Sequence, residues 1–447
     1  MTDHPLRSRL PGPAAPVLAA PLLGAPLLGA PLLAALLLAA LVSPAEAAPR
    51  TVYAGTLQGA GDVVMELDSQ PVNGVLTGRY FYPKHGVDIP LNGTLDALRE
   101  PKTYQQSVDS GQDPESATAP AAAIWQGTLD ASGYHGRWVN ADSGKARPFA
   151  LRRIADYDPD ALAPGSVQAV TDAISGGVGS GIDDAALISD KTAPYDYLKL
   201  AGHAAPVGAD SGSGSVAYRM WRDPRTGFGY PRLSRHPDPQ VLARVNRLLE
   251  QRHWRKNLAA LACKATIYTD GNPAAGSLGG YDDEAIAVAW LSPALMTVTE
   301  SGSLYCGGAH PDNHFEPYTF DLLRGDYLDW NRIFPAYVAE EDGWPKPAPA
   351  LLALIDQARA PLAASQANTA QGTDAAQRDP DDTALEYCGD VWPSYLALGT
   401  QAPGALSLSV SGIGHAMGVC LGTHATVPFK DLTPYLTPGG KAYLIPQ

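Results

Sequence analysis

The sequence predicts an α+β protein in which an antiparallel β-meander, forming a small barrel or half-barrel, precedes an α+β domain with an antiparallel sheet and helices on one face. Three observations lead to this prediction. Residues 48–154 consist of short β-branched or aromatic segments separated by turn residues. Residues 194–447 add two segments whose apolar residues follow one helical face. Between them, residues 155–193 are rich in Asp, Pro, Gly and Ser and lack apolar periodicity, which is typical of a linker.

The β-meander is expected over residues 48–154. Its segments are rich in Val, Tyr, Trp and Thr and end at Gly, Asn or Asp, as strands joined by turns do. The triplet Gly-Thr-Leu recurs at 55–57, 93–95 and 127–129, and glycines inside strands indicate bends or close backbone contacts in a curled sheet. Strands are expected at 51–57, 62–67, 74–82, 87–95, 124–129, 134–139 and 149–154.

The second predicted domain contains two helices among several strands. Asp238 suits a helix N-cap and Pro239 the first helical position, so one helix is expected from about 239 into the 250s. The other is expected at 350–364, and the polar, acidic tract 366–382 after it is expected to be a mobile loop. Strands are expected at 195–200, 216–221, 285–292, 295–301, 318–322, 327–330, 395–398, 406–410 and 425–429.

Residues 1–47 have the layout of a secretory signal peptide. Arg7 and Arg9 form a short basic segment, an apolar run follows at 32–42, and Ala45-Glu46-Ala47 supplies the small residues that a signal peptidase reads. An uncleaved membrane anchor is the alternative, but a span needs about 20 apolar residues and this run is shorter. We therefore expect a periplasmic or secreted protein whose mature chain has no membrane span.

Four cysteines, Cys263, Cys306, Cys388 and Cys420, are spread over the second domain. In an exported chain such isolated cysteines indicate two disulfides, whereas a zinc site usually shows cysteine pairs two to four residues apart. Three connectivities are possible. We favour Cys263–Cys306 with Cys388–Cys420, because each bridge joins neighbouring segments of one predicted domain.

The formal net charge of −14 restricts the classes of partner. An acidic surface repels phosphate backbones, which argues against nucleic acid. The same surface attracts a cationic protein and accelerates its encounter. The chain after residue 47 has no Gly-x-Ser-x-Gly elbow, phosphate loop or His-Glu-x-x-His motif, so neither a cofactor nor a catalytic metal is expected.

Three stretches of the second domain carry a family resemblance. The first is Gly229-Tyr-Pro-Arg-Leu-Ser-Arg, followed after a short spacer by a helix containing Val245-Asn246. The second is Tyr305-Cys-Gly-Gly-Ala-His-Pro311 with Tyr318-Thr-Phe-Asp-Leu after it, and the third is Val427-Pro-Phe-Lys-Asp-Leu-Thr-Pro-Tyr-Leu436. Over residues 215–447 the sequence resembles the extracytoplasmic domain of lysozyme-sensing anti-sigma factors of the RsiV type.

The resemblance implies an extracytoplasmic module that captures lysozyme. The same domain also occurs as a non-catalytic module beside polysaccharide deacetylase domains. In the sensors a transmembrane helix and a cytoplasmic sigma-binding segment accompany the domain, whereas here the expected signal peptide and β-meander precede it. We therefore expect an exported, non-catalytic binding or sensing protein of the cell envelope, which recognises lysozyme or a cell-wall fragment.

The central motif of the resemblance holds the candidate binding residues Gly307, Gly308, His310 and Asp312. His310 and His314 would form a metal-binding pair in a helix, but the two glycines and Pro311 indicate a loop. A tight turn to which His310 hydrogen-bonds and a loop that contacts a partner are the alternatives for this segment.

Other hypotheses remain open at this point. The chain could be a hydrolase or deacetylase-like enzyme acting on cell-wall polymers, in which His310 works beside Asp312 or Asp321. It could also be an envelope assembly scaffold that uses the β-meander as its interaction surface. Within the β-meander, aromatic residues on adjacent predicted strands either form a stacking platform for a glycan or peptide or fill the barrel core. These residues are Tyr80, Tyr82, Trp125 and Trp138.

Overall fold

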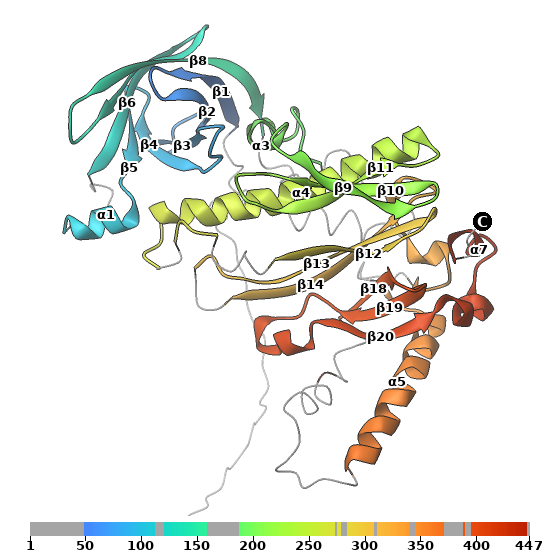
Figure 1. Cartoon of the computed structure of the whole chain (residues 1–447). Coiled ribbons are helices and arrows are strands. Elements are labelled where there is room, and N and C mark those ends of the chain that lie inside the picture. The colour runs from blue at the N-terminus through green and yellow to red at the C-terminus, as the bar shows by residue number, and fades with distance from the viewer. Residues whose placement is uncertain are drawn as a thin grey trace, which may run out of the picture. The chain divides into compact units, whose positions relative to one another are not determined.

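The computed structural model describes residues 49–111, 120–158, 187–272, 275–278, 284–307, 311–338, 345–370, 388 and 395–444 (Figure 1). The expected signal peptide at 1–47, most of the expected linker at 155–193 and the tract from 371 to 382 lie outside these ranges. Among the described residues, no helix combines the length and the apolarity that crossing a bilayer requires.

The N-terminal domain is a closed antiparallel barrel of eight strands, in which each strand pairs with the next and the last pairs with the first (Figure 1). This closure confirms the predicted antiparallel barrel, and it leaves no unpaired strand edge. A short helix, α1 (Tyr104–Asp109), lies between β5 and β6. The strands are β1 (Arg50–Leu57), β2 (Gly61–Asp68), β3 (Leu76–Phe81), β4 (Ile89–Thr94), β5 (Ala97–Pro101), β6 (Ala121–Asp130), β7 (Gly133–Asn140) and β8 (Ala146–Tyr157).

Large side chains fill the barrel from inside. Trp125 is fully buried, and the ring of Tyr134 packs into the same core. Glycines make room for these contacts, because a Cβ at Gly127 would lie 2.5 Å from the ring of Tyr134. At Gly55 a Cβ would lie 2.0 Å from the carbonyl oxygen of Ala150 on β8. Both glycines belong to the Gly-Thr-Leu repeat, so the repeat marks close contacts within the barrel.

Residues 195–200, expected to form a strand, instead form the helix α3 (Pro194–Leu200). Pro194 takes a position in the first helical turn, where its missing N–H has no intrahelical partner to lose. Tyr195 is fully buried against the outer face of the barrel, and Lys199 is buried one turn later. A helix is favoured here over a strand because residues four apart lie on one helical face, so Tyr195 and Lys199 both contact the barrel.

In its described residues, the second domain contains three larger antiparallel sheets and one two-stranded pair. Helix α4 (Pro239–Ala265) begins at the predicted N-cap, where the Asp238 carboxylate accepts from the backbone N–H of Gln240 and Val241. Helix α5 (Pro349–Ala370) extends beyond its predicted end, so the first residues of the expected loop at 366–382 are helical. The strands are β9 (Ala205–Ser213), β10 (Val216–Arg222), β11 (Gly229–Arg235), β12 (Ala285–Leu291), β13 (Leu295–Leu304), β14 (Asp312–Asp321), β15 (Asp326–Tyr327), β16 (Tyr337–Val338), β17 (Lys346–Pro347), β18 (Leu396–Gln401), β19 (Ala405–Val410) and β20 (Gly422–Pro428).

Short helices follow several of these strands. The sequence predicts a strand over 327–330, but pairing with β14 ends at Tyr327. The carboxylate of Asp329 then accepts from the backbone N–H of Asn331 and caps a 3-10 turn, which ends the strand. The short helices are η2 (Thr266–Tyr268), η4 (Trp330–Arg332), η6 (His415–Cys420), η7 (Phe429–Tyr435) and α7 (Lys441–Leu444).

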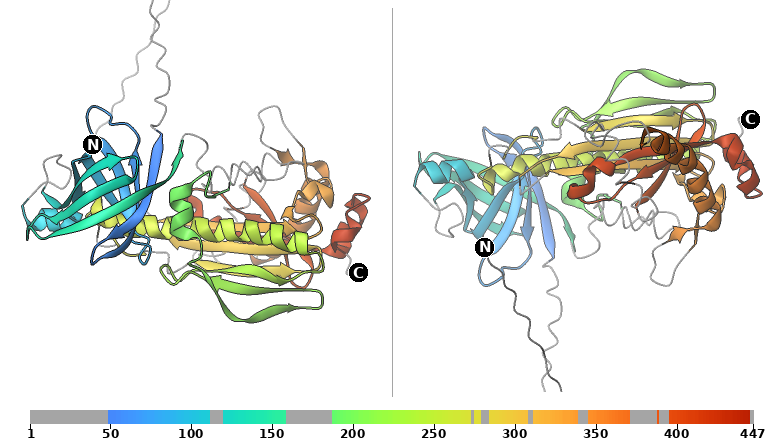
Figure 2. Two further views of the ribbon diagram at one scale, coloured as in Figure 1. Left: turned by 90° about the horizontal axis from the view of Figure 1, so that it is seen from above. Right: turned by 90° about the horizontal axis from the view of Figure 1, so that it is seen from below.

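The sheet β12–β15 is the middle layer of this domain. Val298 on one of its faces packs with Val245 and Leu249 of α4. On the opposite face, the hydroxyl of Thr297 lies 2.6 Å from that of Thr400 on β18, and the sheet β18–β20 covers this side. Figure 2 shows α4 lying lengthwise over the strands. The α+β class is confirmed, with a helix on one face of the middle sheet and a second sheet on the other.

Candidate functional site

The central sequence motif forms the connection between β13 and β14. Gly307 has a positive φ of 112°, and a Cβ there would lie 2.2 Å from a carboxylate oxygen of Asp270, so only glycine fits. Asp312 is the exposed first residue of β14, paired with Leu304. Gly308 and His310 lie outside the described residues. Within the described ranges, no three His, Cys, Asp or Glu side chains gather as a metal site requires.

Two disulfides join the predicted partners. Cys263 in the last turn of α4 bonds to Cys306 in the β13–β14 connection, and Cys388 bonds to Cys420. This confirms the favoured pairing among the three that were possible. The first bridge ties the loop of the central motif to α4, which makes the motif part of the packing between helix and sheet.

Asp321, a candidate of the enzyme hypothesis, lies in a different environment from Asp312. The two residues are the opposite ends of β14, ten residues long, so about 30 Å separates them. The carboxylate of Asp321 is fully buried, lies 3.0 Å from the guanidinium of Arg332 and accepts a hydrogen bond from the Tyr443 hydroxyl at 2.8 Å. Its other oxygen accepts from two backbone N–H groups of the following turn. These contacts give Asp321 a structural role.

Five ionisable side chains form a buried cluster between α4 and the sheet β12–β15. Arg252 and Lys256 are one turn apart on α4. The carboxylate of Glu300 on β13 accepts from Arg252 and lies 3.0 Å from the ammonium of Lys256. Glu284, just ahead of β12, lies 2.6 Å from the same ammonium and 3.0 Å from His314. The His-x-x-x-His spacing suggests a pair of His310 with His314, but His314 contacts Glu284 instead. The signal for the buried cluster is in α4, where two cations four residues apart interrupt the apolar face.

This buried cluster holds α4 on the sheet. Burial alone raises the pKa of Glu300, but the positive charges of Arg252 and Lys256 outweigh it and hold that pKa far below its ordinary range. The hydroxyl of Tyr230 donates to Glu300 at 2.7 Å, and the guanidinium of Arg252 lies 3.1 Å from the ring centre of Tyr318. Glu300 therefore stays ionised, and its buried charge is balanced by the ion pairs with Arg252 and Lys256. The cluster fixes the position of α4.

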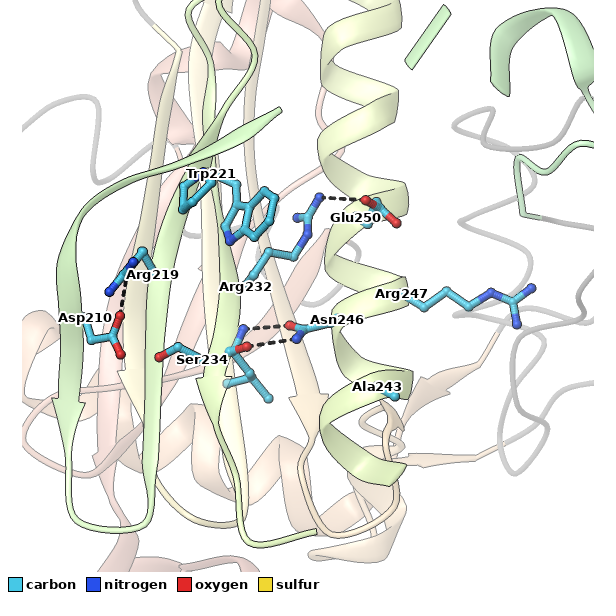
Figure 3. A pocket seen from close by; sticks show the side chains of 11 residues that line it. Asp210, Arg219, Trp221, Arg232, Ser234, Ala243, Asn246, Arg247 and Glu250 are labelled. Atoms are coloured by element: carbon cyan, nitrogen blue, oxygen red, sulfur yellow. Dashed lines mark hydrogen bonds and ion pairs between the residues drawn. The ribbon is translucent and has the colours of Figure 1, made fainter. Parts of the chain in front are cut away.

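A pocket of about 540 Å³ lies where α4 runs beside β11, the edge strand of the β9–β11 sheet (Figure 3). Arg219 and Trp221 of β10, Arg232 of β11 and Arg247 and Glu250 of α4 line it. Figure 3 shows Arg232 reaching toward Glu250, while Arg247 extends away from the strands. Because β10 and β11 pair with Arg219 opposite Arg232, two guanidinium groups and an indole enter one pocket.

Asn246 fixes the wall between α4 and β11. Its side-chain oxygen accepts from the backbone N–H of Leu233 at 2.6 Å, and its side-chain amide donates to the Leu233 carbonyl at 2.8 Å (Figure 3). Both backbone groups belong to an edge strand, so without Asn246 they would have no hydrogen-bond partner on this side of the sheet. Asn246 lies in the first stretch of the family resemblance, and here it sets the geometry of the pocket.

Arg232 is the unusual charge of the pocket. Its side chain is 7 % exposed, and its nearest carboxylate oxygen, on Glu250, is 3.7 Å away. One terminal nitrogen, Nη1, donates to the Pro231 carbonyl at 3.3 Å, while Nη2 has no hydrogen-bond partner among the described residues. Burial lowers the pKa of Arg232 to about 10, although Glu250 opposes the shift. A desolvated guanidinium with so little compensation favours an anion beside it.

The rim of the pocket is polar and solvated. Asp210 lies 2.7 Å from Arg219, and both side chains are about 40 % exposed, so this pair competes little for a ligand bound at Arg232. The partly buried indole of Trp221 adds an apolar surface. The arrangement can hold a ligand that presents an anionic group to Arg232 and a flat face to Trp221.

Neither comparison of the chain with protein-family models nor comparison with curated proteins finds a match. The site is therefore defined by its residues, their burial and their charges.

Proposed function

We propose that this chain is an exported binding protein of the cell envelope that recognises a cell-wall fragment carrying a carboxylate. The observation that supports this function is the buried guanidinium of Arg232, which lines the pocket and whose Nη2 has no hydrogen-bond partner among the described residues. A guanidinium fork matches a carboxylate with two parallel hydrogen bonds. Trp221 supplies the flat surface on which a sugar ring stacks, so the two groups together select an acidic saccharide over a neutral one.

Titration calorimetry with two saccharide probes tests this function. One is an N-acetylglucosamine oligomer, and the other is an oligomer of the same length in which alternate rings carry a lactyl carboxylate. We expect the acidic oligomer to bind at least about tenfold more tightly, because hydrogen bonds to charged groups contribute about 1.5–3 kcal/mol. Equal affinity for both probes, or no binding of either, would exclude the proposal.

Two variants assign the binding to the pocket. Arg232→Leu removes the anion partner and should abolish the preference for the acidic oligomer. Glu250→Gln removes the carboxylate that competes for Arg232 and should tighten binding of the same probe. Arg137→Leu is the matched control, because Arg137 is an exposed arginine on β7 of the barrel and does not line this pocket. Unchanged affinity in Arg232→Leu would place the ligand elsewhere.

Capture of a cationic protein such as lysozyme is the second candidate function. The net charge of −14 favours it, since complementary charge accelerates association. Calorimetry with lysozyme at low and at moderate salt should show binding that weakens as salt screens the charges. Arg232→Leu should leave this interaction intact, which separates it from saccharide binding. Absence of binding at both salt concentrations would remove lysozyme as a partner.

A further inference from the structure

Glu100 places a carboxylate inside the mouth of the barrel. It follows Leu98, a core residue two positions earlier on β5, so its side chain also points inward. One carboxylate oxygen accepts from the Tyr80 hydroxyl at 2.8 Å and from the Trp138 indole N–H at 3.1 Å. The indole N–H of Trp125, fully buried, has no hydrogen-bond partner among the described residues, yet it is near enough to Glu100 to lower the pKa of that carboxyl.

Aromatic rings surround this carboxylate. The rings of Tyr80 and Tyr82 meet edge to face, with 5.6 Å between their centres. Tyr82 and Trp138 are partly exposed, so solvent reaches the aromatic side chains beside Glu100.

The charge of Glu100 is not matched by a cation. Among the described residues it forms no ion pair within 4.0 Å. Arg147, a cation beside Trp138, donates to the Gly59 carbonyl at 2.9 Å and lies 5.9 Å from the centre of the Trp138 ring. A partly desolvated carboxylate among aromatic faces is the combination that binds ammonium groups, through ion pairing and through cation–π attraction. Eight-stranded barrels have room for one small ligand at most, and here core side chains fill the interior, so the mouth is the accessible part.

We propose that the barrel mouth binds an alkylammonium group, with Glu100 as its counter-charge and Tyr82 and Trp138 as its aromatic walls. The site is separate from the pocket at Arg232 and takes the opposite charge. A free small amine and the side chain of a lysine present the same group to it. The hydrogen bonds from Tyr80 and Trp138 hold the Glu100 carboxylate in place before the ligand arrives.

Calorimetry and tryptophan fluorescence with three probes test the proposal on the full chain. The probes are Nα-acetyl-lysine amide, its uncharged analogue Nα-acetyl-norleucine amide, and tetramethylammonium. We expect the lysine derivative and tetramethylammonium to bind and to shift the tryptophan emission. The norleucine derivative should bind at least tenfold more weakly, because it lacks the charge. Norleucine binding as tight as lysine binding would overturn the proposal, as would no binding of either cation.

Two variants, each replacing a carboxylate by the amide of the same shape, test whether the ammonium binds at Glu100. Glu100→Gln keeps the acceptor for Tyr80 and Trp138 but removes the charge, and it should lower affinity for both cations at least tenfold. Asp130→Asn is the control, because Asp130 is an exposed carboxylate at the other end of β6. It should leave cation binding unchanged. Retained binding in Glu100→Gln, or equal losses in the two variants, would assign the ammonium to another surface. Binding of the acidic saccharide should be unchanged in Glu100→Gln, so the two proposed sites succeed or fail independently.

Discussion

The ammonium of Lys199 on α3 lies 2.8 Å from each carboxylate oxygen of Asp88, the residue just ahead of β4. The Lys199 side chain is only 3 % exposed. The hydroxyl of Tyr195 donates to the same carboxylate at 2.7 Å, and the guanidinium of Arg79 lies 3.0 Å from it. A largely desolvated carboxylate with three donors thus joins α3 to the outside of the barrel.

Replacing Lys199 by Met should lower the free energy of unfolding by roughly 3 kcal/mol, because removing one partner of a buried pair leaves a desolvated charge behind. Urea denaturation measures the change. Lys102→Met is the matched control, since its partner Asp142 is 71 % exposed and such a pair contributes no more than about 1 kcal/mol. Equal stability of Lys199→Met and the wild type would contradict this account of the junction.

The same pair predicts a pH dependence. Burial alone raises the pKa of Asp88, but Lys199 and Arg79 outweigh it and lower that pKa below 3.8. The stabilisation is therefore present above the ordinary pKa and is lost as the pH falls through the lowered one. In denaturation measured from neutral pH down to about pH 3, the stability difference between the wild type and Lys199→Met should shrink with acidification. A difference that stays constant would show that Asp88 does not titrate as described.

Glu100→Gln should stabilise the protein near neutral pH. Burial raises the pKa of the Glu100 carboxyl above 4.5, although the donors Trp138 and Tyr80 oppose the shift. A carboxyl with a raised pKa in the folded state weakens folding once it ionises, and this penalty is absent below its ordinary pKa. We expect a higher melting temperature than the wild type near neutral pH and an equal one below about pH 4. Asp130→Asn should show no such gain, because hydrogen bonds from Ser132 lower the pKa of Asp130.

The barrel could be predicted because its signals are local. Strand segments, turn residues and the recurring glycines lie within a few residues of one another, and Gly127 leaves the space that the ring of Tyr134 occupies. The disulfide pairing could be predicted for a similar reason, since each bridge spans a short separation within one domain. The aromatic residues of the barrel were open to two interpretations, a filled core or an exposed stacking platform. Trp125 and Tyr80 fill the core, whereas Trp138 and Tyr82 lie at its edge.

The rest depends on long-range contacts that no local pattern contains. Tyr195 and Tyr197 alternate as in a strand, but Lys199 pairs with Asp88, which is 111 residues away, and the segment becomes a helix. The Arg232 pocket needs the register of β10 with β11 and the position of α4. The glycines and histidines of the β13–β14 connection predict a binding loop, but Gly308 and His310 lie outside the described residues, so their role stays a prediction.

Replacing Cys263 and Cys306 by Ala should lower the free energy of unfolding by about 4 kcal/mol, from loop-closure entropy over their separation. The separation is 43 residues, against 32 for Cys388 and Cys420. Because this entropy grows with the logarithm of loop length, the two double variants should differ by less than about 0.5 kcal/mol. Denaturant unfolding of both variants checks the values. A much larger effect at Cys263–Cys306 would show that the bridge also holds native packing between α4 and the β13–β14 connection.

His253 should make the protein less stable in mild acid. Its side chain is fully buried, its Nε2–H donates to the Phe228 carbonyl at 3.1 Å, and its Nδ1 has no hydrogen-bond partner among the described residues. Burial, with the charge of Arg232, lowers the pKa of His253 from 6.5 to about 4. The unfolded chain therefore takes up a proton at higher pH than the folded one, so stability falls as the pH drops from 6.5 toward 4. The loss approaches roughly 3 kcal/mol, at about 1.4 kcal/mol per pKa unit.

His253→Gln isolates this effect. Glutamine can still donate to the Phe228 carbonyl but does not titrate, and it loses the stacking of His253 on Tyr230. The variant should be less stable than the wild type near neutral pH. The difference in stability should narrow as the pH approaches 4, because only the wild type has an imidazole that takes up a proton on unfolding and so loses stability in acid. Denaturant unfolding at several pH values measures the gap. Parallel curves for the two proteins would show that His253 binds its proton equally well in the folded and unfolded states.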